Sequence, residues 1–438
     1  MKKILDPSRE TWPELLKRPT QSYADIEPLV SDIFDEVKRQ GDLAVKRYIK
    51  KFDGAEIVNL QVDQSTIQQA AALVSDPLKK AIILAKSNIE AFHRSQKVEV
   101  KKIKTAHGVT CWQEKRAIEK VGLYIPGGTA PLFSTILMLA VPASIAGCEE
   151  VVMCTPTDAE GNIHPAVLFT ADLCGITKIY KVGGIQAIAA MTFGTESIPQ
   201  VYKLFGPGNQ YVTVAKQMSL KFGVGIDLPA GPSELLVYAD DSATASFMAA
   251  DLLSQAEHGV DSQVVLVCRS LDKLEEIEAQ ISSQLEQLPR KDIAIKAIEN
   301  SKLIYCSSED EALDLINEYA PEHLIISTSD AVKILPKIKN AGSIFVGDYT
   351  PESAGDYASG TNHTLPTNGY ARNFSGVNLD AFQKSVSFQE ISKEGLQSIG
   401  PAIELMADAE GLFAHKNAVS LRLKNIEETT KYSDDVKN

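Results

Sequence analysis

Short apolar runs that each end in a glycine turn recur through the middle of the chain. LYIPGG at 123–128, IYKVGG at 179–184 and YKLFGPG at 202–208 are each followed by a helical pattern, and the apolar run LLVYAD opens another unit. This order of strand, glycine turn, helix and strand is typical of a parallel sheet with crossover helices. The pattern therefore predicts an α/β layer from about Tyr124 to Pro232.

A second series of alternating predicted helices and strands follows. The predicted helices cover 243–258, 271–287 and 310–319, and the predicted strands are QVVLVC at 263–268, LIYC at 303–306, HLIIS at 323–327 and SIFV at 343–346. The second half of the chain is thus predicted to be α/β as well.

Helical patterns are also predicted outside these two layers. Apolar positions between Ile26 and Phe52 have helical spacing with an interruption near Gly41. After Gly376 the signals are helical again, and the polar end TTKYSDDVKN is expected to be frayed.

The run from Val121 to Cys148 has no charged residue and is long enough to suggest a membrane-spanning helix. Glycines and prolines interrupt it too often for a lipid-exposed span, in which every backbone group must be paired. It is better interpreted as a strand, a glycine loop and a buried helix. The amino-terminal residues have no apolar signal-peptide core, so a cytoplasmic protein is expected.

Composition narrows the possible partners. The chain has 438 residues, 44% of them hydrophobic, and a formal charge of −13. No basic stripe interleaved with aromatic residues is present, which argues against nucleic acid and favours small molecules. Six cysteines without CxxC spacing predict reduced thiols rather than a zinc knuckle or a disulfide framework.

The glycine turns suggest a nucleotide site without proving one. Gly206-Pro207-Gly208 opens a helix as a dinucleotide fingerprint would, but Tyr211 occupies the third glycine position, and the chain has no P-loop motif. Ordinary helix starts explain a lone GxG equally well. Three such turns at the ends of neighbouring parallel strands would nevertheless form a crevice in which a pyrophosphate could lie.

Polar motifs with histidine cluster in the last two fifths of the chain. Gln255 and His258 share one face of a predicted helix, Glu322 and His323 stand side by side at a strand edge, and His415 follows Glu410 by five residues. The long loop Gly342–Pro366 adds four more candidates, which are Asp348, Glu352, Asp356 and His363. Capping and solvent exposure remain alternatives for each motif, whereas together they suit metal binding or proton transfer. His93, His107 and His164 are predicted to be surface groups.

A family resemblance rests on long motifs in order along the chain. These motifs are IPGGTAPLFST, GGIQAIAAMTFGTESIP, FGPGNQYV, LPAGPSELLV, DLLSQAEHG, APEHL, NAGSIFVGDYTPESAGDYASGTNHTLPT and EGLFAH. From about Ser22 onward the chain resembles the histidinol dehydrogenases, zinc enzymes that end histidine biosynthesis. The resemblance implies oxidation of L-histidinol through the aldehyde to L-histidine, with two NAD reduced in turn.

The resemblance also implies a set of site residues. The proton-transfer pair would be Glu322 and His323. One Zn²⁺ per subunit would be held by Gln255, His258, Asp356 and His415. Substrate contacts would come from Ser233, His363 and Glu410 together with His323 and the zinc ligands. The NAD contacts would be Tyr124, Gln186 and Asn209.

The implied architecture is two incomplete Rossmann-like domains with small terminal segments, as in the aldehyde dehydrogenase-like folds. We expect a segment at 1–21, a first α/β domain at 22–123 plus 233–377 carrying most catalytic and zinc residues, an NAD-binding α/β domain at 124–232, and a tail at 378–438. The family resemblance further implies a homodimer in which Glu410 and His415 act in the partner's site.

Three rival functions stay open at this stage. A related dehydrogenase acting on another small alcohol, such as a sulfonated diol, would share the fold. A zinc hydrolase could use Glu322 as the base for metal-bound water. A metal-storage module would have no use for adjacent Glu322 and His323.

Overall fold

The computed structural model of the chain describes residues 1–19, 23–127, 131–229 and 231–435. Contacts divide the chain into a larger unit, Met1–Gln96 with Ile118–Phe382, and a smaller unit, Lys97–Ala117 with Gln383–Asn438. The expected boundary at residues 21 and 22 lies outside the described residues, as does part of the glycine turn, residues 128–130.

A parallel six-stranded sheet forms one half of the larger unit, in the order β1-β11-β10-β9-β12-β13. Its strands are β1 (Lys2–Leu5), β9 (Glu234–Ala239), β10 (Gln263–Cys268), β11 (Lys302–Tyr305), β12 (His323–Ser327) and β13 (Ser343–Val346). His323 opens β12 and pairs with Leu235 of β9 and with Ser343 of β13. The motif APEHL therefore enters the sheet at the amino ends of its central strands.

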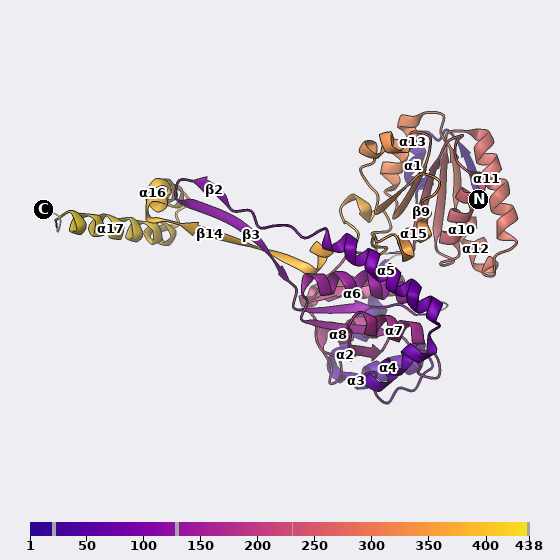
Figure 1. Cartoon of the computed structure of the whole chain (residues 1–438), viewed down its shortest axis with the longest axis horizontal. Coiled ribbons are helices and arrows are strands. Elements are labelled where there is room, and N and C mark those ends of the chain that lie inside the picture. The colour runs from indigo at the N-terminus through magenta and orange to yellow at the C-terminus, as the bar shows by residue number, and fades with distance from the viewer. Residues whose placement is uncertain (20–22, 128–130, 230, 436–438) are drawn as a thin grey trace. The chain divides into compact units, whose positions relative to one another are not determined.

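Helices cover both faces of this sheet because its strands alternate between two apolar sides. Leu235, Val237 and Ala239 pack with α10 (Ala245–Ala256), α11 (Leu271–Leu285) and α12 (Lys291–Glu299). Leu236 and Tyr238 pack on the opposite side with α1 (Trp12–Leu15), α13 (Glu309–Tyr319) and α14 (Ala331–Ile334) (Figure 1). The remaining short helices here are η1 (Arg9–Thr11), η3 (Leu335–Lys337), α15 (Glu352–Tyr357) and η4 (Tyr370–Arg372).

The other half of the larger unit is a parallel five-stranded sheet in the order β6-β5-β4-β7-β8. The strands are β4 (Lys120–Tyr124), β5 (Glu150–Thr155), β6 (Lys178–Lys181), β7 (Lys203–Phe205) and β8 (Gly225–Ile226). Strand order reverses between β4 and β7, so the carboxyl ends of these strands flank a topological switch point.

Helices also pack on both faces of this second sheet. One face carries α2 (Tyr23–Gln40), α3 (Asp42–Phe52), α8 (Gly184–Phe193) and α9 (Gln210–Ser219). The other face carries α4 (Gln64–Leu73), α6 (Phe133–Ala146) and α7 (Pro165–Leu173), with α5 (Asp76–Arg94) packed on α6. The short helices η2 (Leu220–Phe222) and η5 (Leu379–Phe382) complete this half.

The core of this half includes the amino-terminal helices. Ile33 and Val37 of α2 and Val45 of α3 share a core with Val152 of β5, although the expected division groups 22–123 with 233–377. The amino-terminal helices therefore pack with the 124–232 layer, because their apolar stripe covers that sheet. Residues 2–5 instead extend the six-stranded sheet through β1.

The smaller unit is an antiparallel sheet with two helices. Its strands β2 (Ile103–Ala106), β3 (Val109–Ala117) and β14 (Gln383–Ile391) are followed by α16 (Lys393–Ala409) and α17 (Phe413–Asp435). We expected only helical structure after Gly376, so β14 corrects that prediction. Its alternating Val386 and Phe388 were the overlooked signal, and Phe388 stacks on Trp112 of β3. The end expected to fray continues α17 to Asp435, because no glycine or proline interrupts it.

Most predicted elements of the larger unit are confirmed, including the break near Gly41 between α2 and α3. The uncharged run forms β4 and the buried helix α6, and none of the described helices is long and apolar enough to cross a membrane. His107 and His164 are exposed as expected. His93 is buried, which corrects its prediction: its Nδ1 lies 2.9 Å from the Ile89 carbonyl on its own helix.

Candidate active site

The backbone N–H and carbonyl of one residue, Glu234, contact the two predicted proton-transfer residues. The backbone N–H of Glu234 donates to Glu322 Oε2 at 2.8 Å, and the Glu234 carbonyl oxygen lies 3.2 Å from His323 Nδ1. A carbonyl can only accept, so Nδ1 carries the proton and donates to it. In the neutral imidazole this leaves Nε2 as the nitrogen that can take up a proton.

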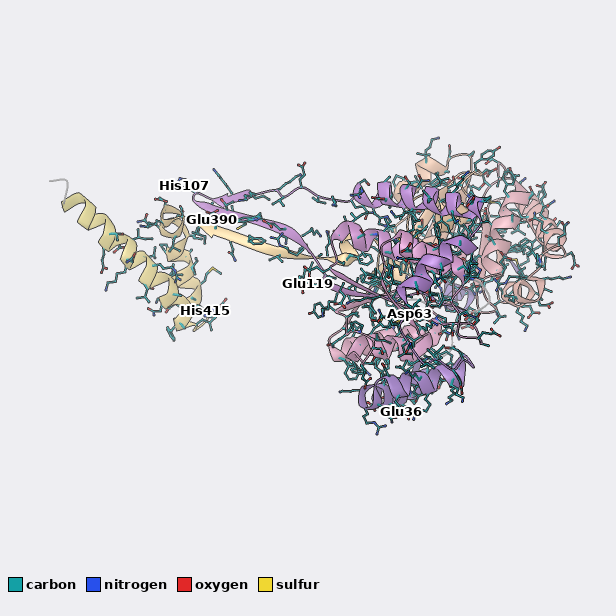
Figure 2. All side chains as sticks on the ribbon, turned by 60° about the horizontal axis from the view of Figure 1, so that its bottom comes forward. Glu36, Asp63, His107, Glu119, Glu390 and His415 are labelled. Carbon is teal, nitrogen blue, oxygen red and sulfur yellow. The ribbon has the colours of Figure 1, made fainter. Side chains whose placement is uncertain are left out.

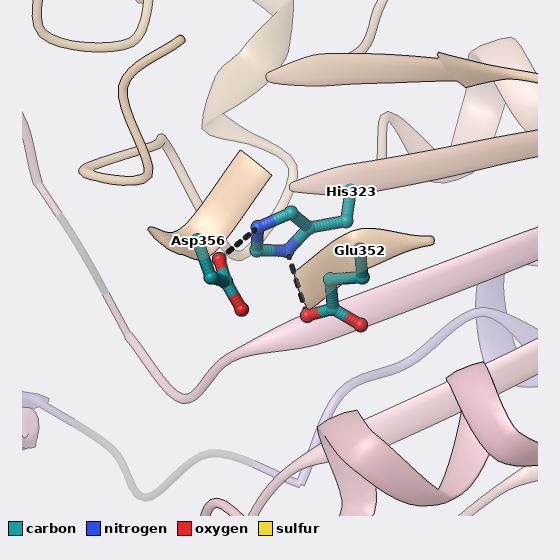
Figure 3. Close-up of side chains that lie close together, drawn as sticks. All are labelled: His323, Glu352 and Asp356. Carbon is teal, nitrogen blue, oxygen red and sulfur yellow. Dashed lines mark ion pairs between the residues drawn. The ribbon is translucent and has the colours of Figure 1, made fainter. Parts of the chain in front are cut away.

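Two further carboxylates lie beside His323, both carried by the short helix α15 (Figure 3). Glu352 Oε1 lies 3.5 Å from Nδ1, and Asp356 Oδ1 lies 3.7 Å from Nε2. They are four residues apart and therefore share one face of the helix. The loop after β13 carries α15 from the carboxyl end of that strand back to the amino end of β12.

These neighbours shift the acid–base properties of the pair. Burial raises the pKa of Glu322 to about 8, near the range in which a general base is effective. Burial alone would lower the pKa of His323, but the carboxylates of Glu352, Glu322 and Asp356 outweigh it and raise that pKa to about 10. Both groups are therefore poised to exchange protons above the ranges of free Glu and His.

A cavity of about 270 Å³ gathers most of the predicted site. It is lined by the predicted residues Ser233, Gln255, His258, Glu322, His323, Asp356 and His363, among others. Ser233 precedes β9, Gln255 lies near the end of α10, and His258 follows that helix. The cavity thus lies at the amino ends of the six-stranded sheet, and we call it the catalytic cavity.

Several buried polar atoms in and beside this cavity fit a cation. Both amide atoms of Gln255, which is 0% exposed, and both carboxylate oxygens of Glu352, which is 1% exposed, have no hydrogen-bond partner in the described part of the chain. Unpaired buried groups of this kind are costly. Gln255, His258 and Asp356 offer oxygen and nitrogen donors suited to zinc. His323, Glu352 and Asp356 form a second possible set, with ligand atoms within 4.8 Å of one another.

His363 is held by protein groups on both sides of its ring. Its Nδ1 lies 2.9 Å from the Asp356 carbonyl oxygen, and its Nε2 lies 3.2 Å from Thr135 Oγ1. Nδ1–H therefore donates to the carbonyl, and Nε2 accepts from the hydroxyl. Burial lowers the pKa of His363, which favours this neutral form. Through Thr135 on α6, His363 ties the α15 loop to the other half of the larger unit.

A second cavity, of about 570 Å³, lies at the carboxyl ends of the five-stranded sheet. The three predicted NAD contacts, Tyr124, Gln186 and Asn209, all line it. Gly127 and Gly184 of the first two glycine turns line it as well, so the expected crevice is present at these two turns. Pro207 and Gly208 of the third turn line the catalytic cavity instead. Asn209 lines both cavities, and its side chain caps α9 by accepting from the Val212 N–H at 3.1 Å. We call this second space the nucleotide cavity.

Known proteins were compared with this chain. The family model for histidinol dehydrogenase matches residues 16–423. The chain belongs to the histidinol dehydrogenase family. It is 58% identical over 426 residues to the histidinol dehydrogenase of Bacteroides thetaiotaomicron, covering 97% of this chain and 100% of that one. The Escherichia coli K12 enzyme is 50% identical over 418 residues, covering 95% of each. The crystal structure of the Elizabethkingia anophelis enzyme superposes with a TM-score of 0.95 at 54% identity, covering 98% and 99%.

Two residues that the histidinol dehydrogenase resemblance assigned to the site lie in the smaller unit. Glu410 follows α16 and is exposed. His415 lies in the first turn of α17 and is exposed too (Figure 2). The structure places them on the same turn between two helices. Their assignment to a partner's site remains a prediction.

Sequence reasoning missed an ion pair that holds the glycine turn before Asn209, the residue that lines both cavities of this histidinol dehydrogenase homologue. Lys216 and Asp227 are buried and pair at 2.5 Å. Lys216 Nζ donates to the Gly206 carbonyl at 2.8 Å, and the Gly206 N–H donates to Asp227 at 2.8 Å. Gly206 has φ of 129°, and an added Cβ would lie 2.1 Å from the Tyr124 carbonyl oxygen. The pair therefore holds a turn that only glycine can form.

Thiol chemistry has no evident place in either cavity. Among the described residues, none of the six cysteines lines the catalytic or the nucleotide cavity, and all six are free thiols. Burial raises the pKa of Cys148 and Cys268 to about 11, which keeps these thiols protonated and unreactive. The expectation of reduced thiols is confirmed.

Proposed function

We propose that this protein is a zinc-dependent histidinol dehydrogenase that converts L-histidinol through L-histidinaldehyde to L-histidine with two NAD, the last step of histidine biosynthesis. Membership of the family supports the reaction. The observation that carries the proposal is that the backbone of Glu234 contacts both Glu322 and His323. They lie in a cavity that shares Asn209 with the nucleotide cavity.

Proton transfer is assigned to the two side chains held by Glu234. A cation held by Asp356 would offset the carboxylates that raise the pKa of His323, and so favour the neutral ring. In that form His323, with Nδ1–H fixed on the carbonyl, takes the substrate hydroxyl proton at Nε2 as hydride leaves the carbinol carbon. Glu322 then removes a proton from the water that adds to the aldehyde, and the second hydride leaves the hydrated carbon. The raised pKa of Glu322, about 8, makes its carboxylate a stronger base than an exposed one.

Zinc is assigned to a polar set that includes Gln255, whose amide atoms have no hydrogen-bond partner in the described part of the chain. Gln255, His258 and Asp356 would hold it from one subunit, and His415 from the other. When bound, Zn²⁺ supplies positive charge and open coordination positions that fix the amine and imidazole of histidinol. Ser233 and His363 line the same cavity and would position the rest of the substrate, with Glu410 added by the partner.

NAD is assigned to the nucleotide cavity. Tyr124 is buried, and its hydroxyl accepts the Gly184 N–H at 3.2 Å, which fixes the second glycine turn. Gln186 is also buried, and its Oε1 has no partner in the described chain. The side chains and glycine turns leave room for a dinucleotide whose reactive ring reaches past Asn209 toward His323.

A homodimer is proposed from the surface of the smaller unit. The helices α16 and α17 expose large apolar side chains, among them Leu405 (73%) and Phe413 (69%). Apolar side chains gathered on two packed helices are typical of a protein interface. A second copy would cover them and bring Glu410 and His415 into its neighbour's catalytic cavity. The free thiols suit a cytoplasmic enzyme.

One assay tests the reaction. NAD reduction is followed with L-histidinol as the substrate, and NADH formed per histidinol consumed is counted by absorbance and amino-acid analysis. Two NADH per histidine formed is expected. Absence of NADH, or turnover only with another small alcohol, would contradict the assigned substrate.

A second assay tests the metal. Removing zinc with a chelator should abolish oxidation of histidinol, while calorimetry should show NAD binding nearly unchanged. Full turnover in a preparation shown by elemental analysis to lack metal would remove zinc from the proposal.

Mixed subunits test the partner's contribution. The variants His258→Ala and His415→Ala are each expected to be inactive, and mixed dimers of the two should recover some activity because one site per dimer is intact. Mixing His258→Ala with Gln255→Ala is the control, since both changes damage the same half-site. No recovery in the first mixture would show that each chain builds its own site.

A further inference from the structure

An unexplained carboxylate lines the nucleotide cavity. Asp53 directly follows α3, and its backbone N–H donates to the Ile49 carbonyl at 2.8 Å. Its side chain does not serve the fold in the same way, because Asp53 Oδ2 is buried and meets no hydrogen-bond donor among the residues described. Together with Leu29 and Phe52, Asp53 brings α2 and α3 to the wall of this cavity.

The position of Asp53 is unfavourable for folding alone. A negative charge at a helix carboxyl end opposes the helix dipole. A buried carboxylate oxygen without a donor also costs free energy. Burial raises the pKa of Asp53, which is consistent with this cost. A ligand with hydroxyl donors would satisfy the oxygen that the chain leaves unpaired.

Other unpaired atoms in the same cavity point to a polar ligand. Gln186 Oε1 and Thr157 Oγ1 are also buried without a partner in the described chain, and both residues line this cavity. Gln186 is almost completely buried, so solvent does not explain its oxygen. Leu29, Phe52 and Tyr211 are partly exposed around the same space and offer flat or apolar surface for a ring.

The shared residue Asn209 orients a dinucleotide. The reacting ring must reach the catalytic cavity, which Asn209 also lines. Leu29, Phe52 and Asp53 line only the nucleotide cavity, so the adenosine half would lie against them. A carboxylate beside an adenosine ribose accepts from its 2′-hydroxyl and repels a 2′-phosphate.

We propose that Asp53 reads the unphosphorylated 2′-hydroxyl of the adenosine ribose and thereby sets a preference for NAD over NADP. This inference rests on the proposed dinucleotide site. Lys51 is the competing charge, since its Nζ lies 5.3 Å from the ring centre of Phe52. A 2′-phosphate drawn to Lys51 would still have to approach the Asp53 carboxylate.

The test measures the dissociation constants of NAD, NADP and 2′-deoxy-NAD by calorimetry, without turnover. The native protein should bind NAD at least about tenfold more tightly than either analogue, because the bond to a charged acceptor is lost or a like charge is introduced. Asp53→Asn should bind NAD about tenfold more weakly and reduce both ratios toward one. Glu56→Gln is the matched control, because it removes an exposed carboxylate paired with Lys50 and should leave the ratios unchanged.

The outcomes separate the inference from the function beneath it. Equal binding of NAD and 2′-deoxy-NAD by the native protein would overturn the role of Asp53, even if Asp53→Asn failed to fold. Unchanged ratios in a folded Asp53→Asn variant, or a preference of the native protein for NADP, would overturn it as well. Failure of the native protein to bind NAD at all would instead contradict the dinucleotide site.

Discussion

The two cavities of the larger unit share Asn209 but differ in most of the side chains that line them. The catalytic cavity lies at the amino ends of β9 and β12 and is crowded with charged side chains, including Glu322 and His323. The nucleotide cavity lies at the carboxyl ends of β4 to β7 and is walled by glycine turns and a few polar side chains such as Gln186.

The difference separates chemistry from binding. In the catalytic cavity, buried carboxylates surround one imidazole, so the local charges are strong and proton affinities shift. In the nucleotide cavity, Gly127 and Gly184 line the space, and the ion pair of Lys216 with Asp227 holds the Gly206 turn that leads to Asn209. Changes in the first region should alter rates, whereas changes in the second should alter cofactor affinity.

The largest effect expected in the catalytic cavity comes from His323→Asn. The Asn amide can still donate to the Glu234 carbonyl, but no group remains to take the hydroxyl proton. We expect kcat for histidinol to fall by about 10²–10⁴-fold, the usual contribution of acid–base catalysis. NAD affinity, measured by calorimetry, should stay within about twofold. A comparable loss of NAD affinity would contradict the separation of proton transfer in the catalytic cavity from cofactor binding in the nucleotide cavity.

Glu322→Gln should affect the two oxidation steps in the catalytic cavity to different extents. The Gln carbonyl oxygen can still accept from the Glu234 N–H, so the geometry is kept while the base is lost. Oxidation of L-histidinaldehyde should slow about a hundredfold, and oxidation of histidinol to the aldehyde much less. Rapid-mixing kinetics with each substrate measures both steps. Equal slowing would refute the separate assignment of the water-activating base.

Asp227→Asn tests the Gly206 turn, which leads to Asn209 in the nucleotide cavity. It leaves the Lys216 charge buried without its partner, so the free energy of unfolding should fall by about 3–5 kcal/mol. NAD should bind more weakly because the Gly206 turn loosens, while kcat at saturating NAD changes little. Denaturant titration and calorimetry measure the two quantities. Lys221→Gln is the control, since that exposed lysine pairs with Glu27 and should cost at most about 1 kcal/mol.

The smallest effect is a change in the pH dependence of stability at Asp251→Asn. Asp251 on α10 is buried and accepts the Glu352 N–H, and burial raises its pKa to about 7. Because the unfolded pKa is near 4, Asp251 ionises in the unfolded state while it stays protonated in the folded state, so stability falls progressively as pH rises from about 4 to 7. The Asn variant should lose less stability over this interval than the native protein in denaturant titrations. A steeper loss would contradict the sign.

The sequence predicted the repeated strands and helices of the larger unit because apolar runs and glycine turns mark them locally. It failed for the packing of α2 and α3, since an amphipathic stripe shows that a helix is covered but not by which sheet. It also failed for β14, whose alternation of residues such as Val386 and Phe388 is short and partly exposed.

The site divides in the same way. Family motifs named the residues that line both cavities, although the role of each remains a prediction. Motifs could not show that the backbone N–H and carbonyl of Glu234 contact Glu322 and His323, because every residue type has these backbone groups and only the fold brings them together. Glu352 stood out only as one acid among several in a long loop, and its contact with His323 depends on how that loop folds back.

The two hydrogen bonds that place acid and base use the backbone of Glu234, whereas its buried carboxylate pairs with Arg18. Almost any residue there supplies the same N–H and carbonyl, and only proline removes the donor. Substitutions in this strand can therefore alter packing and stability while the two backbone hydrogen bonds to Glu322 and His323 are kept.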